Sequence, residues 1–262
     1  MASEKIRLGG MALQNGVLVH GPTAWAAAVR TPSGELKVAS AKKRVLAGRL
    51  DRPILRGPAR ILESMAVLPE LKRRLPEARF PFERPAVLAA MAASAVAVRV
   101  VRGSPLRPVA SELASGLLSF APAALALRGS ELAAYHGAEH VSIGSYEHGE
   151  VRAKEHERCG SHLLGPFVAT SALGGALVAR LPRSVRGPAR AAASLGALAA
   201  ATELFAWMVR NPERPLAKAL ARPGHELQHR LATAEPTPEQ LEVAEAALRA
   251  CLELEHDAAR AD

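Results

Sequence analysis

Four long uncharged runs dominate the pattern of hydrophobic and polar positions, and each predicts a helix that is apolar on all sides. The runs cover residues 85–98, 113–127, 163–179 and 191–202. Each is shorter than the stretch of about 20 apolar residues that crosses a bilayer. They form two pairs, however, and each pair is joined by a short link rich in arginine and proline. This spacing predicts two helical hairpins, either embedded in a membrane or forming the core of a soluble, alanine-rich bundle.

The segment before these runs has strand character. Short apolar stretches punctuated by glycine and proline fill residues 1–50, and the Thr-Pro-Ser-Gly sequence at 31–34 predicts the turn of a β-hairpin. The glycines Gly9, Gly10 and Gly16 are expected to lie in tight turns.

The remaining segments flank the hairpins and are more polar. Within residues 51–84, apolar side chains recur at helical spacing up to Leu68, and prolines then interrupt the pattern. Residues 238–255 predict an amphipathic helix that begins at Pro238. We therefore predict an α+β fold that is predominantly α. Its expected parts are a β-rich segment (1–50), a basic helical segment (51–84), the apolar hairpins (85–210) and a polar C-terminal region (211–262).

The chain carries a net charge of +9, and residues 41–84 contribute 12 Lys and Arg against 5 Asp and Glu. Such a segment suits nucleic acid, an anionic membrane surface, or solvent without a partner. Only 3% of the residues are aromatic, which argues against base stacking and so against nucleic acid. We expect the lipid bilayer of the cytoplasmic membrane as the partner. The basic segments, including the arginine-rich links, are expected to face the cytoplasm, and the two cysteines fit a reducing compartment.

Residues 135–162 contain five of the nine histidines and one of the two cysteines. Within this region, His136 and His140 stand four positions apart, so a helix would place both imidazoles on one face. Together with Glu139 they form His-x-x-Glu-His, an inverted form of the zinc-peptidase motif. This pattern predicts a divalent metal ion, zinc in the first instance, with Glu139 as the catalytic general base.

A zinc site of this kind needs a third protein ligand. Glu203 interrupts an apolar stretch, where a carboxylate is costly unless it is paired or binds a metal. His156, Cys159 and His162 offer further ligand atoms at spacings of three residues, although a buried, inert thiol is an alternative for Cys159. The predicted metal ligands are therefore His136, His140, Glu203, His162 and Cys159.

A second motif, His225-Glu226-x-x-His229, matches the forward zinc-peptidase pattern. Prolines and a glycine stand close on both sides of it, so its helix would be short. No third ligand is evident in the sequence, and a surface helix is the preferred interpretation.

The central motifs resemble the YqhQ-like family of bacterial membrane proteins. The resemblance rests on Tyr-His-Gly-Ala-Glu-His at 135–140, on Tyr146-Glu147 and on His-Glu-Arg-Cys-Gly-Ser at 156–161. It extends to the N-terminal glycines and to the C-terminal stretch 223–244. The chain departs from the family pattern at Gly144 and Ser145, where a further histidine and cysteine are usual, and His148 or His162 could compensate.

The family is uncharacterised and carries the description of predicted metal-dependent enzymes, so the resemblance implies a membrane protein with metal-dependent chemistry. Combined with the motif, it favours metal-assisted hydrolysis by a divergent family member. The alternative is a non-enzymatic, membrane-associated scaffold that holds its histidines in hydrogen bonds and binds no metal.

Overall fold

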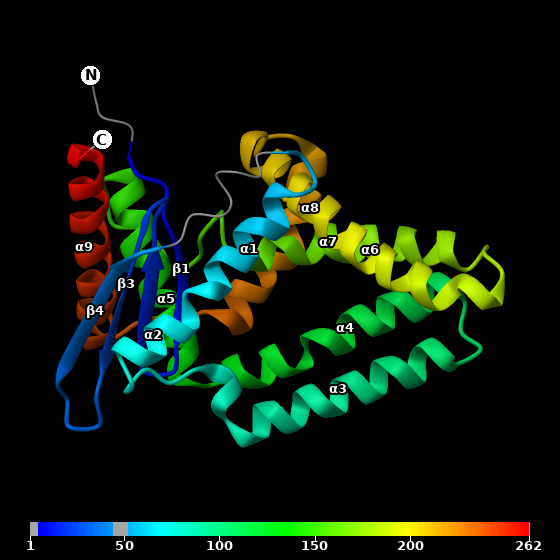
Figure 1. Ribbon diagram of the computed structural model, residues 1–262, viewed down its shortest axis with the longest axis horizontal. Helices are drawn as coiled ribbons and strands as arrows, with labels where there is room; N and C mark the ends of the chain where they lie inside the picture. The colour runs from blue at the N-terminus through cyan, green and yellow to red at the C-terminus, as the bar shows by residue number, and fades with distance from the viewer. Residues whose placement is uncertain (1–4, 44–51, 262) are drawn as a thin grey trace.

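The computed structural model describes residues 5–43 and 52–261, so residues 1–4, 44–51 and 262 of the expected segments lie outside the description. The N-terminal part is an antiparallel sheet in the order β1-β2-β3-β4 (Figure 1). Its strands are Gly9–Leu13, Gly16–His20, Ala24–Arg30 and Leu36–Lys42. The predicted hairpin joins β3 to β4, and Gly34 provides the left-handed backbone of its turn with φ 84°.

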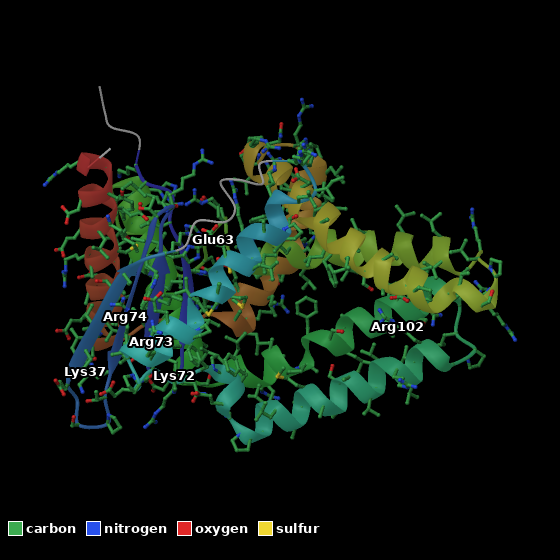
Figure 2. All side chains as sticks on the ribbon, in the orientation of Figure 1. Lys37, Glu63, Lys72, Arg73, Arg74 and Arg102 are labelled. Carbon is green, nitrogen blue, oxygen red and sulfur yellow. The ribbon has the colours of Figure 1, made fainter. Side chains whose placement is uncertain are left out.

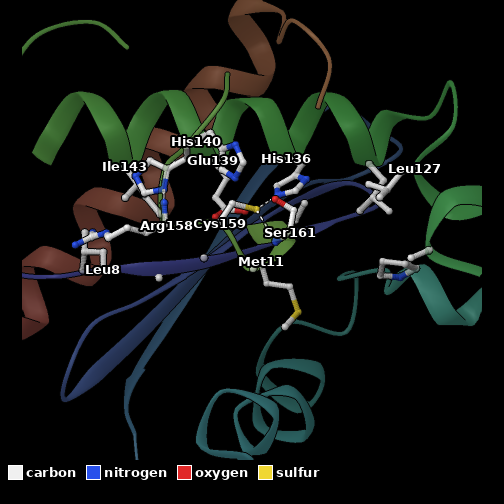
Figure 3. Close-up of a pocket in the computed structure, with 18 of the residues that line it drawn as sticks. Leu8, Met11, Leu127, His136, Glu139, His140, Ile143, Arg158, Cys159 and Ser161 are labelled. Carbon is white, nitrogen blue, oxygen red and sulfur yellow. Dashed lines mark hydrogen bonds between the residues drawn. The ribbon is translucent and has the colours of Figure 1, made fainter. Parts of the chain in front are cut away.

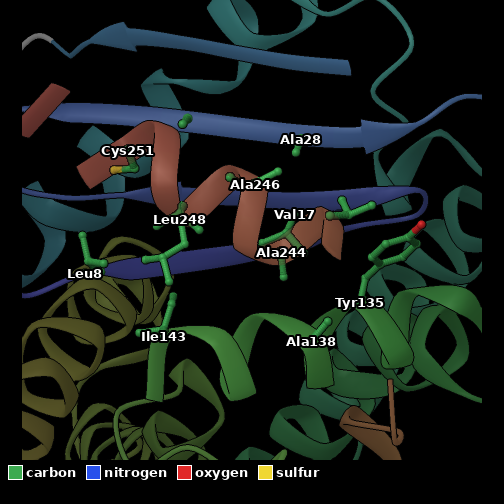
Figure 4. Packing of buried hydrophobic residues seen from close by; sticks show 14 residues of the cluster. Leu8, Val17, Ala28, Tyr135, Ala138, Ile143, Ala244, Ala246, Leu248 and Cys251 are labelled. Carbon is green, nitrogen blue, oxygen red and sulfur yellow. The ribbon is translucent and has the colours of Figure 1, made fainter. Parts of the chain in front are cut away.

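Both faces of the sheet are covered by helices. On one face, α5 (Glu131–His148) and α9 (Pro238–Ala261) bury a cluster that includes Val17 and Ala28 (Figure 4). On the other face, Trp25 packs with Leu71 of α2 (Leu68–Arg74). This double coverage explains why β2 and β3 are continuous apolar runs in place of alternating ones.

The two predicted helical hairpins are present. Helix α3 (Pro85–Gly103) packs along α4 (Pro108–Leu127), α6 (Leu164–Val178) packs along α7 (Arg186–Arg210), and α4 also contacts α6. Proline stands at the first position of α3 and α4, where the missing N–H has no intrahelical partner to lose. The predicted fold class, α+β and predominantly α, is confirmed.

Short elements connect these parts of the molecule. Helix α1 packs on α7, and α8 packs on the 3₁₀ turn η3. The connecting elements are α1 (Arg56–Ala66), η2 (Pro81–Glu83), η3 (Gly160–Leu163), η4 (Arg183–Val185), α8 (Pro215–Leu227) and the π-helical turn η5 (Gln228–Ala232).

The four hairpin helices are long and apolar enough to cross a membrane. Many of their large apolar side chains point away from the protein; Leu117 is 69% exposed and Leu195 is 71% exposed. Apolar area left in water costs roughly 25 cal/mol per Å² relative to its burial, whereas lipid tails accommodate it. The outward-facing leucines and valines therefore suggest a membrane protein and argue against a soluble bundle that hides them in a core.

The arginine-rich links lie at the ends of the hairpins farthest from the sheet (Figure 1). Arg102 marks this distal end in Figure 2, whereas Lys72, Arg73 and Arg74 of α2 lie beside the sheet. A helix that spans a bilayer places its two ends on opposite sides. In spanning hairpins the distal links and the segments beside the sheet would therefore face opposite compartments, and which of them faces the cytoplasm stays a prediction.

Cysteine labelling should distinguish the two ends. Ser33, in the β3–β4 turn, and Ser184, in the link between α6 and α7, are both exposed. In intact cells, a membrane-impermeant maleimide should label only one of the variants Ser33→Cys and Ser184→Cys, and permeabilised cells should show both. The unmodified protein gives the background from its two native cysteines. Equal labelling of both variants before permeabilisation would contradict the spanning arrangement.

Candidate metal centre

Helix α5 brings the two histidines of the central motif together. It begins after Ser130 and ends at Gly149, whose φ of 78° gives the left-handed cap that glycine favours. The rings of His136 and His140 lie 4.3 Å apart between centroids and face the same cavity (Figure 3). The helix thus provides the shared face that their spacing predicts.

Backbone carbonyls fix the orientation of both rings. Nδ1 of His136 lies 2.8 Å from the carbonyl oxygen of Ala232, and Nδ1 of His140 lies 2.6 Å from that of Lys154. A carbonyl oxygen can only accept, so each Nδ1 carries the proton and donates it. Nε2 is then the nitrogen of each ring that is not used by a carbonyl. Burial lowers the pKa of His140, the neighbouring His136 lowers it further, and the ring therefore stays neutral.

Cys159 completes the cluster from the loop that follows α5. Its Sγ atom lies 3.5 Å from Nε2 of His136 and 3.5 Å from the backbone nitrogen of Ser161, at the start of η3. One ligand atom from each of His136, His140 and Cys159 lies within 4.8 Å of the others. Burial raises the pKa of the Cys159 thiol, so without a cation the sulfur keeps its proton.

The side chain of Glu139 lies against β1 of the sheet. This side chain lines the same cavity, and burial raises its pKa to about 8. A Cβ atom at Gly10 of β1 would stand 2.4 Å from Oε1 of Glu139, so only glycine leaves room for the carboxylate. The expectation of a tight turn is wrong for Gly9 and Gly10, which lie within β1, whereas Gly16 pairs with Leu13 and closes the turn between β1 and β2. Glycine inside a strand instead marks a close approach of another group.

Two further histidines line the cavity, and of these the sequence gives a ligand spacing for His156 but none for His20. His20, at the end of β2, has its pKa lowered to about 4 by burial and by the nearby Lys43, and its ring approaches Gly9. The ring of His156 lies 5.5 Å from that of His140. His148 and His156 both lie beside Gly144, but of these two and His162 only His156 lines the cavity.

A buried glutamine holds the loop that carries Cys159. Gln228, at the start of η5, accepts from the backbone nitrogen of His156 and donates to the hydroxyl of Ser161 at 2.8 Å. The other end of η5 supplies the Ala232 carbonyl that orients His136. Arg158, on the same loop, forms an ion pair with Glu147 of α5. The π-helical turn η5 thus contacts the site at both of its ends, and such turns are frequent at functional sites.

Two of the predicted ligands lie elsewhere. Glu203 of α7 accepts from Nε and Nη2 of Arg56, at 2.8 and 2.5 Å, so its charge is neutralised by α1. His162 faces Gln228 and lines a different cavity, next to α7 and α8. Of the five predicted ligands, the fold therefore brings together His136, His140 and Cys159, and it places Glu203 and His162 elsewhere. A carboxylate in an apolar stretch can be balanced by an arginine as well as by a metal. The sequence does not reveal this pair, because Arg56 lies 147 residues from Glu203.

The second histidine motif is not assembled into a metal cluster within residues 5–43 and 52–261. The rings of His225 and His229 stack at 6.4 Å, and His229 contacts the carboxylate of Glu155 at 2.9 Å. His225 is exposed. The surface interpretation of this motif therefore agrees with its surroundings.

Comparison with known families adds one finding. Residues 130–254 match a family described as "Protein of unknown function (DUF1385)". The chain contains a DUF1385 domain. YqhQ-like proteins are in this family, and the matched residues include the central motifs that carry the resemblance. The DUF1385 domain includes the cluster of His136, His140 and Cys159 but leaves out the sheet and the α3–α4 hairpin. The chain matches no curated protein and no solved structure.

Proposed function

We propose that the protein is a membrane-bound, metal-dependent hydrolase, and that His136, His140 and Cys159 hold its divalent ion, zinc in the first instance. The observation that supports this most is the pairing of both Nδ1 atoms with backbone carbonyls. Histidines that bind metals commonly donate their other N–H in this way, which fixes the tautomer and the ring orientation. Here both Nε2 lone pairs are left beside one sulfur atom.

The donor set and its spacing fit a catalytic site. Zinc bound to nitrogen at about 2.1 Å and to sulfur at about 2.3 Å would separate tetrahedral ligands by about 3.6 Å, and Nε2 of His136 lies 3.5 Å from Sγ of Cys159. Structural zinc sites use four protein ligands, whereas catalytic sites use three and keep one position open. Three ligand residues beside a cavity of about 460 Å³ match the second kind.

Glu139 is the proposed general base. When bound, a divalent ion supplies Lewis-acid activation of water or of the substrate. Glu139 then takes a proton from the attacking water, and it returns that proton to the leaving oxygen as the bond to the carbonyl or phosphoryl centre breaks. The pKa of about 8 keeps this carboxyl largely protonated near neutral pH without a cation nearby. Its role as a base therefore depends on a bound ion.

We place the protein in the cytoplasmic membrane with the sheet and the cavity on the cytoplasmic side. The segments that flank the hairpins on the sheet side (65–84, 128–163 and 210–230) carry 14 Lys and Arg, and the two distal links (99–108 and 180–190) carry 7. Basic residues near the ends of spanning helices favour the cytoplasm. Unpaired cysteines fit the same compartment.

Cobalt spectroscopy tests the ligand set directly. Protein purified in detergent and reloaded with Co²⁺ should show the visible bands of a tetrahedral site and a near-ultraviolet charge-transfer band from the thiolate. The Cys159→Ser variant should lose the charge-transfer band and bind the ion at least tenfold more weakly, because serine replaces the thiolate with a poor ligand.

The buried Cys251 provides the matched control for this experiment. It lies on α9 among apolar side chains, and Cys251→Ser should leave the cobalt spectrum unchanged. A charge-transfer band that survives in Cys159→Ser, or a protein that takes up no Co²⁺, would refute the proposed centre.

A further inference from the structure

The cavity at the metal centre is lined by both polar and apolar groups. The imidazoles, Glu139 and Cys159 lie in its middle, and Leu8 and Ile143 lie beside Arg158 at one end (Figure 3). Met11, Ala126, Leu127 and Leu132 add apolar surface on the side of α4. In Figure 3, Leu127 lies at one end of the cavity, Arg158 at the other, and the candidate ligands between them. A site for a wholly polar substrate has no need of such apolar surface.

The apolar surface on the side of α4 is built from a candidate membrane span. Ala123, Ala126 and Leu127 lie on one face of the last turns of α4, which ends at Leu127. Ala126 packs with Val87 of α3 and with Leu132 of α5. The surface at the end of a bilayer-spanning helix thus continues as a wall of the cavity, next to the candidate ligands.

The size of the cavity also fits a ligand larger than a metal ion and a water molecule. A metal ion and a water molecule occupy a few tens of Å³, and the cavity measures about 460 Å³, within the range of about 300–1,000 Å³ seen for small-molecule sites. The cavity therefore has room for part of a hydrocarbon chain, whose burial against the apolar lining is favourable.

We propose that this cavity binds a membrane lipid or a lipid-like amphiphile, with its hydrocarbon along α4, its polar group toward Arg158 and its hydrolysable linkage at the metal centre. This inference rests on the proposed function for the reacting group, but binding of the hydrocarbon does not require the metal. The substrate would enter from the bilayer along the end of α4.

A photoreactive lipid tests the proposal. The protein is reconstituted in phosphatidylcholine bilayers that contain phosphatidylcholine with a diazirine on one acyl chain, and the crosslinked residues are mapped by mass spectrometry. Labelling is expected at Met11 and Leu132, which line the cavity. Leu117 is 69% exposed on the middle of α4 and reports the lipid that surrounds the protein.

Two matched tryptophan variants of α4 separate cavity binding from surface contact. Ala123 and Ala121 are both exposed on the same helix, but of the two only Ala123 lines the cavity. Ala123→Trp should reduce labelling of Met11 and Leu132 at least fivefold, with Leu117 unchanged, and Ala121→Trp should change none of them. Absence of labelling at Met11 and Leu132, or equal labelling there in both variants, would overturn the proposal.

Removal of the metal with a chelator distinguishes this proposal from the proposed function. Labelling of Met11 in the chelator-treated protein is expected to match that of the untreated protein. If the unmodified protein holds no metal but the cavity is labelled, the hydrolase proposal fails and the lipid site stands. If metal is bound and the cavity is not labelled, the lipid proposal alone fails.

Discussion

Replacing both histidines of α5 with alanine is expected to abolish metal binding. Purified, unmodified protein should contain about one equivalent of zinc, and the His136→Ala/His140→Ala variant should contain less than a tenth of that amount. Two of the three ligand atoms are removed, and the remaining Cys159 thiol is buried with a raised pKa, so it cannot hold the ion alone. Elemental analysis after size-exclusion chromatography in detergent measures this content.

The chain offers a closely matched control in its second motif. His225 and His229 are also four residues apart and near a glutamate, but they lie on the surface. The variant His225→Ala/His229→Ala should keep the full metal content. Circular dichroism should show unchanged helix content in both double variants. Equal zinc in the two double variants would show that the α5 histidines are not ligands.

The second large effect concerns Glu139 in the metal-free protein. Its folded pKa of about 8 lies above the ordinary value of 4.5, so the folded state holds a proton that the unfolded chain has released. The stability from this group is complete below pH 4.5 and is lost as pH rises toward 8. The difference of about 3.5 units corresponds to roughly 5 kcal/mol at most. Glu139→Gln removes this loss because glutamine stays neutral.

Thermal unfolding in detergent with a chelator present measures this difference. The unmodified protein should lose stability between pH 5 and pH 9 by more than Glu139→Gln does, so that the variant is the more stable protein at pH 9. The exposed Glu253→Gln on α9 serves as the control and should follow the unmodified protein. Parallel pH profiles for the unmodified protein and Glu139→Gln would show that Glu139 titrates normally. Added zinc should flatten the profile of the unmodified protein, because a nearby cation favours the carboxylate.

Much of the architecture follows from periodicity and from proline and glycine. The apolar runs give the hairpin helices, the Pro-x-Gly turn gives the β3–β4 hairpin, and Pro238 starts the last helix. These features depend on residues that are close together in the sequence, so the sequence predicts them. The shared face of His136 and His140 is also predictable, because it depends only on their spacing along one helix.

The features that the sequence does not predict depend on contacts between residues that are distant in the sequence. The charge of Glu203 is balanced by Arg56, and no local pattern shows whether an arginine or a metal will meet an isolated carboxylate. The sequence around Gly10 is typical of a turn, and only the fold shows that the side chain of Glu139 packs against this glycine. His20 stands outside any motif with ligand spacing, and only the packing of β2 against α5 brings it to the cavity.

The coverage of the N-terminal sheet by the C-terminal helix has a consequence for synthesis. The backbone nitrogen of Ala24 donates to Glu255 of α9 at 2.7 Å, a contact across 231 residues. Strands β2 and β3 leave the ribosome early, but the helix that covers one of their faces is made last, after the hairpins that must enter the bilayer. An exposed apolar sheet is prone to aggregation while it waits. We therefore expect truncation before α9 to yield an aggregating, chaperone-bound product, even though every membrane helix and every candidate metal ligand would be present.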